Sequence, residues 1–112
     1  MELQVETYLK DQWQVVKVSG EVDSKTVGDL RDFLDQEVKG QTPIALDLSG
    51  VSFMSSAGLR TLLTLYRQTE AHKVPLALVA LQRQVADTMK VTGFFKYFTV
   101  YESISDLPQT SQ

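Results

Sequence analysis

The residues FMSSAGLR, Phe53 to Arg60, lie between a run typical of a buried strand, IALDLSGV, and an apolar pattern of helical period, LRTLLTLY. Two serines, an alanine and a glycine therefore occupy the place where a strand leads into a helix. A serine at a helix N-cap satisfies a free backbone N–H group and stabilises the helix by roughly 1 kcal/mol. One serine suffices for that, so the other leaves a functional role open.

Gly58 raises a second question about this junction. Glycine in the first turn of a helix is less favourable than alanine by roughly 1 kcal/mol. Its presence is easier to explain where another backbone must approach closely. The residues alone leave two interpretations open, a plain helix start and a surface that a partner approaches.

Strand and helix patterns alternate on both sides of this junction. Apolar residues alternate or run continuously in the strands, and they recur every three or four positions in the helices. The predicted elements are strands Leu3–Leu9 and Trp13–Ser19, a helix from the N-cap Ser24 to Val38 that Gly40 ends, strand Pro43–Leu48, helix Ser56–Ala71, strand Pro75–Leu81, helix Gln82–Thr92 ended by Gly93, strand Phe98–Tyr101 and a small helix capped by Ser103.

This order, β-β-α-β-α-β-α-β-α, predicts a single α/β domain, which is also the usual content of a chain of 112 residues. Strands that alternate with helices require right-handed crossovers and a mostly parallel sheet, with the N-terminal strand attached as an antiparallel edge. We expect the domain to span residues 1–107. The tail LPQTSQ, which starts at Leu107 and includes residues 108–112, is expected to fray.

The composition excludes several classes of protein. The absence of cysteine rules out a disulfide scaffold and a thiolate metal site. A net charge of -3 with scattered Lys and Arg gives no attraction to nucleic acid or anionic membranes. The longest apolar run, PLALVAL, is far shorter than the ~20 residues that span a bilayer, and the N-terminus lacks the apolar core of a signal peptide. These features predict a soluble, cytoplasmic protein without membrane insertion or direct nucleic-acid binding.

The sequence also lacks the residue patterns of common enzymes. His72 is the single histidine, and we interpret it as an exposed loop residue. No acidic cluster has calcium-loop spacing, and no nucleophile elbow or nucleotide-binding motif is present. Acidic residues such as Asp29, Asp32 and Asp35 fit a solvated helix face. We therefore expect no enzyme activity, no metal site and no cofactor.

The run DLSGVSFMSSAGLRTLL, together with GEVD at Gly20–Asp23, resembles the STAS domain family, in particular the bacterial anti-sigma factor antagonists. The resemblance covers nearly the whole chain, from the strand order to the helix opening at SSAGL. It implies a binding module that sequesters an anti-sigma factor while unphosphorylated and releases it when phosphorylated. The implied partners are an anti-sigma factor that is also a serine kinase, and a PP2C-type phosphatase that resets the switch.

The family's motif, commonly D-S-S-G-L, implies functional residues in this chain. Aligning FMSSAGL with it makes Ser56 the phosphoacceptor and places Ser55 where the family often has aspartate. Asp47 matches the acidic residue that ends the central strand, and Arg60 is either a neighbour of the phosphate or a solvated arginine. The implied partner-binding residues are Asp23, Met54, Ser55, Ala57, Gly58 and Leu59, although Met54 also fits a core position.

Phosphate would act on the interface rather than on the fold. It adds about -1.5 to -2 charges and three acceptor oxygens, which a helix N-terminus tolerates. An uncompensated charge desolvated in an interface costs roughly several kcal/mol, enough to change affinity by orders of magnitude. Two alternatives keep the fold and change the role: a STAS protein of another partner-switching circuit, and an accessory subunit of a membrane transporter.

Overall fold

The computed structural model describes residues 3–38 and 41–109. Its strands are β1 (Gln4–Lys10), β2 (Trp13–Val22), β3 (Ile44–Met54), β4 (Leu76–Val79) and β5 (Thr99–Tyr101). Its helices are α1 (Val27–Glu37), α2 (Ser56–Ala71) and α3 (Arg83–Thr92), with 3-10 turns η1 (Phe95–Tyr97) and η2 (Ile104–Asp106).

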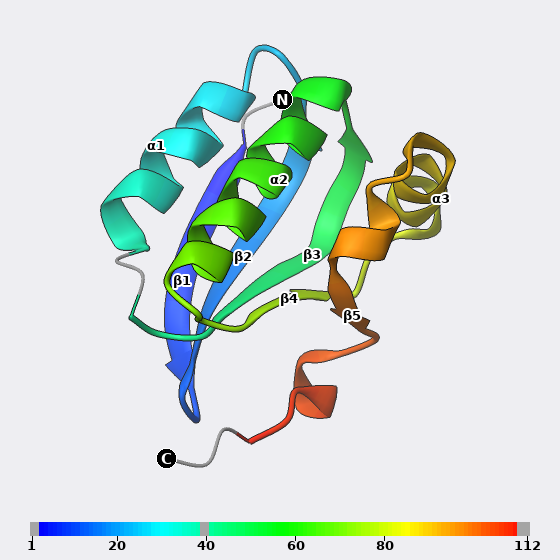
Figure 1. Ribbon diagram of the computed structural model, residues 1–112. Helices are drawn as coiled ribbons and strands as arrows, with labels where there is room; N and C mark the ends of the chain where they lie inside the picture. The colour runs from blue at the N-terminus through cyan, green and yellow to red at the C-terminus, as the bar shows by residue number, and fades with distance from the viewer. Residues whose placement is uncertain (1–2, 39–40, 110–112) are drawn as a thin grey trace.

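The strands form one sheet in the order β1-β2-β3-β4-β5. β1 pairs with β2 antiparallel, and all the other neighbours are parallel. Each crossover therefore moves one strand along the sheet in the same direction, and right-handed crossovers of this kind place their helices on one face. Figure 1 shows α1 and α2 side by side over the sheet. The predicted single α/β sheet with an antiparallel N-terminal edge is confirmed.

The central strands β2 and β3 are longer than the sequence predicted. The GEVD run does not end β2, because the strand continues through two register shifts to Val22. Gly20 lies beside one of these shifts with φ +117°, a conformation that glycine adopts without strain. β3 continues in parallel to Met54, so Asp47 lies inside the strand and not at its end. Both strands thus reach the same edge of the sheet.

The predicted helix bounds are correct for α2 and for the end of α3, where Gly93 has φ +83°. They are wrong for α1, which begins at Val27 with Thr26, and not Ser24, in the N-cap position. The segment after Ser103 forms a single 3-10 turn in place of the predicted small helix. Gly40 lies outside the described residues.

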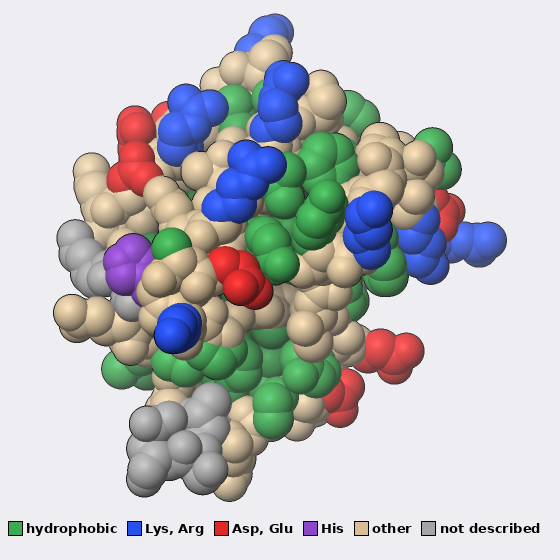
Figure 2. Space-filling model, viewed as in Figure 1, with side chains coloured by type: hydrophobic (Ala, Val, Ile, Leu, Met, Phe, Trp, Pro, Cys, Tyr) green, Lys and Arg blue, Asp and Glu red, His purple; other side chains and the backbone are tan. Residues whose placement is uncertain are grey.

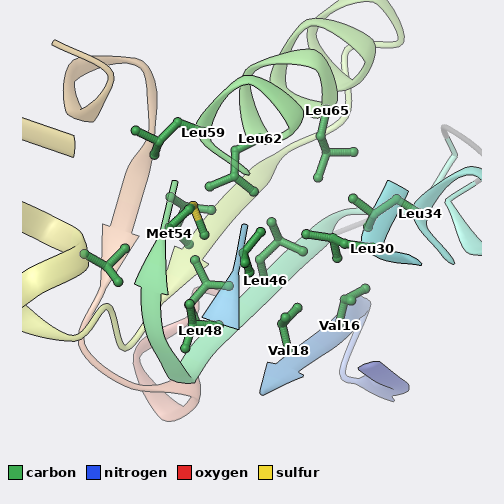
Figure 3. Close-up of a cluster of buried hydrophobic side chains, with 14 of the residues drawn as sticks. Val16, Val18, Leu30, Leu34, Leu46, Leu48, Met54, Leu59, Leu62 and Leu65 are labelled. Atoms are coloured by element: carbon green, nitrogen blue, oxygen red, sulfur yellow. The ribbon is translucent and has the colours of Figure 1, made fainter. Parts of the chain in front are cut away.

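The main hydrophobic core fills the space between the sheet and the helices. Alternate residues of the strands point toward this face, and α2 contributes Leu59, Leu62 and Leu65 at helical spacing. Figure 3 shows Leu62 next to Met54 of β3 and Leu65 on the side of Leu30 and Leu34 of α1, in the same cluster as the side chains of β2. The junction after β3 is therefore built on the main hydrophobic core.

A smaller cluster covers the opposite face of the sheet and involves the C-terminal segment. Leu107 is buried there, at 7% exposure, in the same cluster as Trp13. The Trp13 indole Nε1–H donates to the carbonyl oxygen of Pro108 at 2.7 Å. The prediction that the tail LPQTSQ frays is wrong for Leu107, which is buried, and for Pro108, whose carbonyl oxygen is hydrogen-bonded. Residues 110–112 lie outside the described residues.

Replacing Leu107 with alanine should uncover the single tryptophan. The substitution removes buried apolar atoms, so we expect the free energy of unfolding to fall by roughly 2 kcal/mol. Native-state fluorescence of Trp13 should shift to longer wavelength as water reaches the indole. Val91→Ala is the matched control, because Val91 is 87% exposed; it should leave the emission unchanged and should not lower the free energy of unfolding, since alanine is the better helix former. An unshifted emission spectrum in Leu107→Ala would contradict the packing of the tail on Trp13.

Candidate functional site

The paired ends of β2 and β3 place two loop starts next to each other. Val22 is the register partner of Met54, and the backbone N–H of Ser55 donates to the carbonyl oxygen of Val22 at 2.8 Å. The chain leaves β2 at Asp23 and leaves β3 at Ser55. Residues far apart in sequence therefore share one edge of the sheet, directly before α1 and α2.

Ser55 and Ser56 have different roles in the structure. Ser55 is the N-cap of α2, with an extended backbone (φ −80°, ψ 175°) and a side-chain oxygen that accepts from the N–H of Gly58 at 3.4 Å. Ser56 is the first helical residue and is exposed. Within the described part of the chain its hydroxyl has no hydrogen-bond partner. The structure thus uses one serine as the cap and leaves the other hydroxyl accessible.

Three residues predicted to contact a partner lie inside the protein instead. Met54 and Leu59 are only 3% and 1% exposed and belong to the main core. Gly58 is also buried, and a Cβ built on it would lie 2.7 Å from Cγ of Met54 and 2.8 Å from Cγ1 of Val22. The fold itself therefore requires this glycine, so that the first turn of α2 can approach the ends of β2 and β3. The interpretation that Gly58 makes room for a partner is wrong.

Phe53 is a surface residue that the sequence analysis did not select. Its side chain is 41% exposed, two residues before the cap Ser55. Simple alternation along the strand does not identify it, because Ser52 and Phe53 are both exposed between the buried residues Val51 and Met54. Ala57 is half-buried on the other side of the serines. We refer to Asp23, Phe53, Ser55, Ser56 and Ala57 together as the junction surface.

Asp23 organises the chain between β2 and α1. Its Oδ1 accepts from the backbone N–H groups of Lys25 at 2.9 Å and Thr26 at 3.1 Å. Its carbonyl oxygen accepts from the N–H of Val27, the first residue of α1, at 2.8 Å. The hydrogen bond from Lys25, followed by those from Thr26, lowers the pKa of Asp23 below its ordinary value. The carboxylate that accepts backbone N–H groups before α1 therefore belongs to Asp23, whereas the sequence analysis predicted a cap at Ser24.

Arg60 lies one turn after Ser56 on α2 and is exposed. Residues at i and i+4 of a helix share a face, so the guanidinium is within reach of a group attached to Ser56. No described residue forms an ion pair with Arg60. The arrangement is compatible with both roles that the sequence analysis left open.

The other residue considered for catalysis, His72, lies away from the junction surface. His72 is exposed at the C-terminal end of α2, with Nδ1 2.9 Å from the carbonyl oxygen of Gln68. Among residues 3–38 and 41–109, no three His, Cys, Asp or Glu side chains are grouped so as to hold a metal ion. No helix formed by these residues is long and apolar enough to cross a membrane.

The chain belongs to the STAS domain family, whose family model matches residues 4–107. It is 32% identical over 87 residues to BtrV of Bordetella bronchiseptica, a provisionally named anti-sigma factor antagonist, covering 77% of this chain and 75% of BtrV. It is 29% identical to an anti-sigma-B factor antagonist of Staphylococcus aureus, covering 83% and 87% of the two chains. The crystal structure of an anti-sigma factor antagonist from Mycobacterium paratuberculosis superposes with a TM-score of 0.85 at 28% identity, covering 94% and 90%.

Replacing Gly58 with alanine should destabilise the junction. The added Cβ has no room beside Met54 and Val22, so we expect the free energy of unfolding to fall by roughly 1–3 kcal/mol. In the matched control Gly28→Ala, the new Cβ meets nothing within 4 Å, and the better helix propensity of alanine should raise stability by roughly 0.5–1 kcal/mol. Urea unfolding, monitored by Trp13 fluorescence, measures the free energy of unfolding of both variants. Equal changes in Gly58→Ala and Gly28→Ala would contradict the packing described for Gly58.

Replacing Asp23 with alanine should make the protein less stable in a pH-dependent way. The pKa of Asp23 is lower in the folded protein, so its stabilising contribution is present above its ordinary pKa of 3.8 and is lost as the pH falls through the folded value. The difference in thermal midpoint between wild type and Asp23→Ala should therefore be larger at neutral pH than in strong acid. Glu102→Ala, which removes an exposed carboxylate, is the control. A difference that stays constant with pH would contradict the anchoring role of the ionised carboxylate.

Proposed function

We propose that this protein is a cytoplasmic anti-sigma factor antagonist, switched by phosphorylation of Ser56. Unphosphorylated, it binds an anti-sigma factor that is also a serine kinase, and thereby frees a sigma factor. Phosphorylation of Ser56 by that kinase ends the binding, and a PP2C-type phosphatase restores it. The observation that carries the proposal is the division of roles between the serines: Ser55 caps α2, whereas the Ser56 hydroxyl is exposed and has no structural task among the described residues.

The proposed switch leaves the fold in place. Phosphate on Ser56 would sit at the first turn of α2, where the helix dipole favours negative charge. The cap would remain, because Ser55 and not Ser56 provides it. Arg60 would pair with the phosphate from one turn further along the helix. The free energy of folding would therefore change little, and the effect would fall on the partner.

The partner would contact the junction surface. Phe53 supplies an exposed aromatic ring, a residue type that often dominates binding energy when an interface buries it. Asp23, Ser55 and Ala57 would surround it at the same edge. Met54, Gly58 and Leu59 would contribute indirectly, by holding α2 against the ends of β2 and β3. A phosphate added within such an interface would lose its hydration, and the single guanidinium of Arg60 would neutralise only part of its charge of about -1.5 to -2, at a net cost of roughly several kcal/mol.

The proposal assigns no catalytic residue to this chain. Its relatives carry the name anti-sigma factor antagonist, which denotes a binding regulator. In the proposed reaction the protein is the substrate of the kinase, and Ser56 receives the phosphoryl group. The kinase supplies the nucleotide site and the catalytic groups.

Mass spectrometry tests this proposal on the protein recovered from its own cells under several growth conditions. We expect phosphate localised to Ser56, with an occupancy that changes with condition and is absent in Ser56→Ala. The matched variant Ser55→Ala should retain phosphorylation and should lose about 1 kcal/mol of folding stability, because it removes the cap.

A single unmodified mass under every condition would contradict the switch. It would favour a constitutive binding role, such as the accessory subunit of a transporter. Phosphate found on Ser55 in place of Ser56 would contradict the proposed division of roles.

A further inference from the structure

A groove runs between α1 and α2, starting beside the first turn of α2. Its larger part has a volume of about 180 Å³ and is lined by Arg31, Ala57, Arg60, Thr61 and Thr64. A smaller continuation shares three of these residues and is lined further along by Asp35 and Gln68, among others. We call the larger part the α1–α2 groove. It begins at Ala57, the residue that follows Ser56.

The α1–α2 groove carries two arginines without counter-ions. Arg31 and Arg60 are exposed, and neither forms an ion pair or a side-chain hydrogen bond with any residue that the structure describes. Figure 2 shows Lys and Arg side chains over α1 and α2, with Asp and Glu side chains beside them on the α1 side, and further Lys and Arg side chains around α3. A guanidinium presents several N–H donors in a planar fork, which matches the two oxygens of a carboxylate.

The other polar side chains that line the groove have no free donor for a carboxylate, so the arginines are its donors. Thr61 donates its hydroxyl to the carbonyl oxygen of Ala57 at 3.1 Å, and Thr64 donates to that of Arg60 at 3.0 Å. Their donors are therefore used within α2. Ala57, Thr61 and Thr64 recur at helical spacing on one face, and their small size keeps the space between the helices open.

Gly28 extends the open surface on α1. It lies one turn before Arg31 and hence on the same flank of the helix. A Cβ added there meets nothing within 4 Å, unlike a Cβ added at Gly58. Glycine is less favourable than alanine inside a helix, and the packing of this chain does not require it at Gly28. A small residue at this position leaves room for another molecule beside Arg31.

We propose that the α1–α2 groove docks an acidic segment of the partner protein, whose carboxylates pair with Arg31 and Arg60. This inference takes its partner from the proposed function and extends the interface from the junction surface along α2. It also gives the phosphate a second effect. A negative charge on Ser56 would lie near the same arginines and would weaken their attraction for the partner's carboxylates.

A titration monitored by NMR tests the groove directly. The isotope-labelled full chain is titrated with an acetylated peptide of about 20 alanine-rich residues, long enough to form a helix, that carries two glutamates, and in parallel with the same peptide carrying glutamines. We expect the glutamate peptide to shift the side-chain Nε signals of Arg31 and Arg60 and the amide signals of Gly28 and Ala57. The Nε signal of Arg83, an exposed arginine on α3, should stay unchanged and serves as the internal control.

Variants separate docking from general charge effects. Arg31→Gln and Arg60→Gln should each weaken peptide binding by about fivefold, while Arg83→Gln should leave it unchanged. Gly28→Gln should not lower the thermal midpoint, since the site is open and glutamine is the better helix former, and it should weaken binding by placing a side chain beside Arg31. The proposal would be overturned if Arg83→Gln weakened peptide binding as strongly as Arg31→Gln and Arg60→Gln do. It would also be overturned if Gly28→Gln left the binding unchanged.

Two further outcomes of the titration would also overturn it. Equal shifts with the glutamine peptide would show that charge is not recognised. Equal shifts with inorganic phosphate at the same concentration would show a site for small anions only. The titration uses this chain and the peptide alone, so its result stands whether or not Ser56 is phosphorylated in cells.

Discussion

The contact between the ends of β2 and β3 is the constraint on which the rest of the structure depends. Val22 pairs with Met54, and the N–H of Ser55 continues this pairing to the carbonyl oxygen of Val22 at 2.8 Å. Gly58 then lets α2 start directly above both residues, because any side chain there would collide with them. The loop starts at Asp23 and Ser55 are therefore held by the core itself, and the junction surface has a rigid support.

This support explains how a small chemical change could act on binding without acting on the fold. The groups that maintain the junction, namely the Ser55 cap, the Gly58 contact and the hydrogen bonds of Asp23, are distinct from the exposed hydroxyl of Ser56. No described residue uses the Ser56 hydroxyl as a hydrogen-bond partner, so a charge added there breaks no contact that holds the fold. In the proposed mechanism the partner would experience that charge together with Phe53 and the arginines of the α1–α2 groove.

Sequence periodicity was sufficient for the order of elements, the bounds of α2 and the glycine that ends α3. Periodicity did not predict the features that depend on strand pairing and on packing between elements. The register shift near Gly20 arises from the pairing of β2 with β3. The sequence of β2 alone therefore did not predict that the strand continues to Val22. The motif likewise did not separate buried Met54 from exposed Phe53, because a residue's side of the sheet depends on the irregular end of β3.

The central claim is that phosphate on Ser56 changes the surface and leaves the fold intact. The most direct measurement compares the unphosphorylated and the Ser56-phosphorylated protein in two assays, calorimetric affinity for the anti-sigma factor kinase and free energy of unfolding. The account predicts an affinity at least about a hundredfold lower after phosphorylation, with an unfolding free energy that changes by less than about 1 kcal/mol. Equal affinities, or a loss of affinity accompanied by unfolding of the phosphorylated protein, would contradict it.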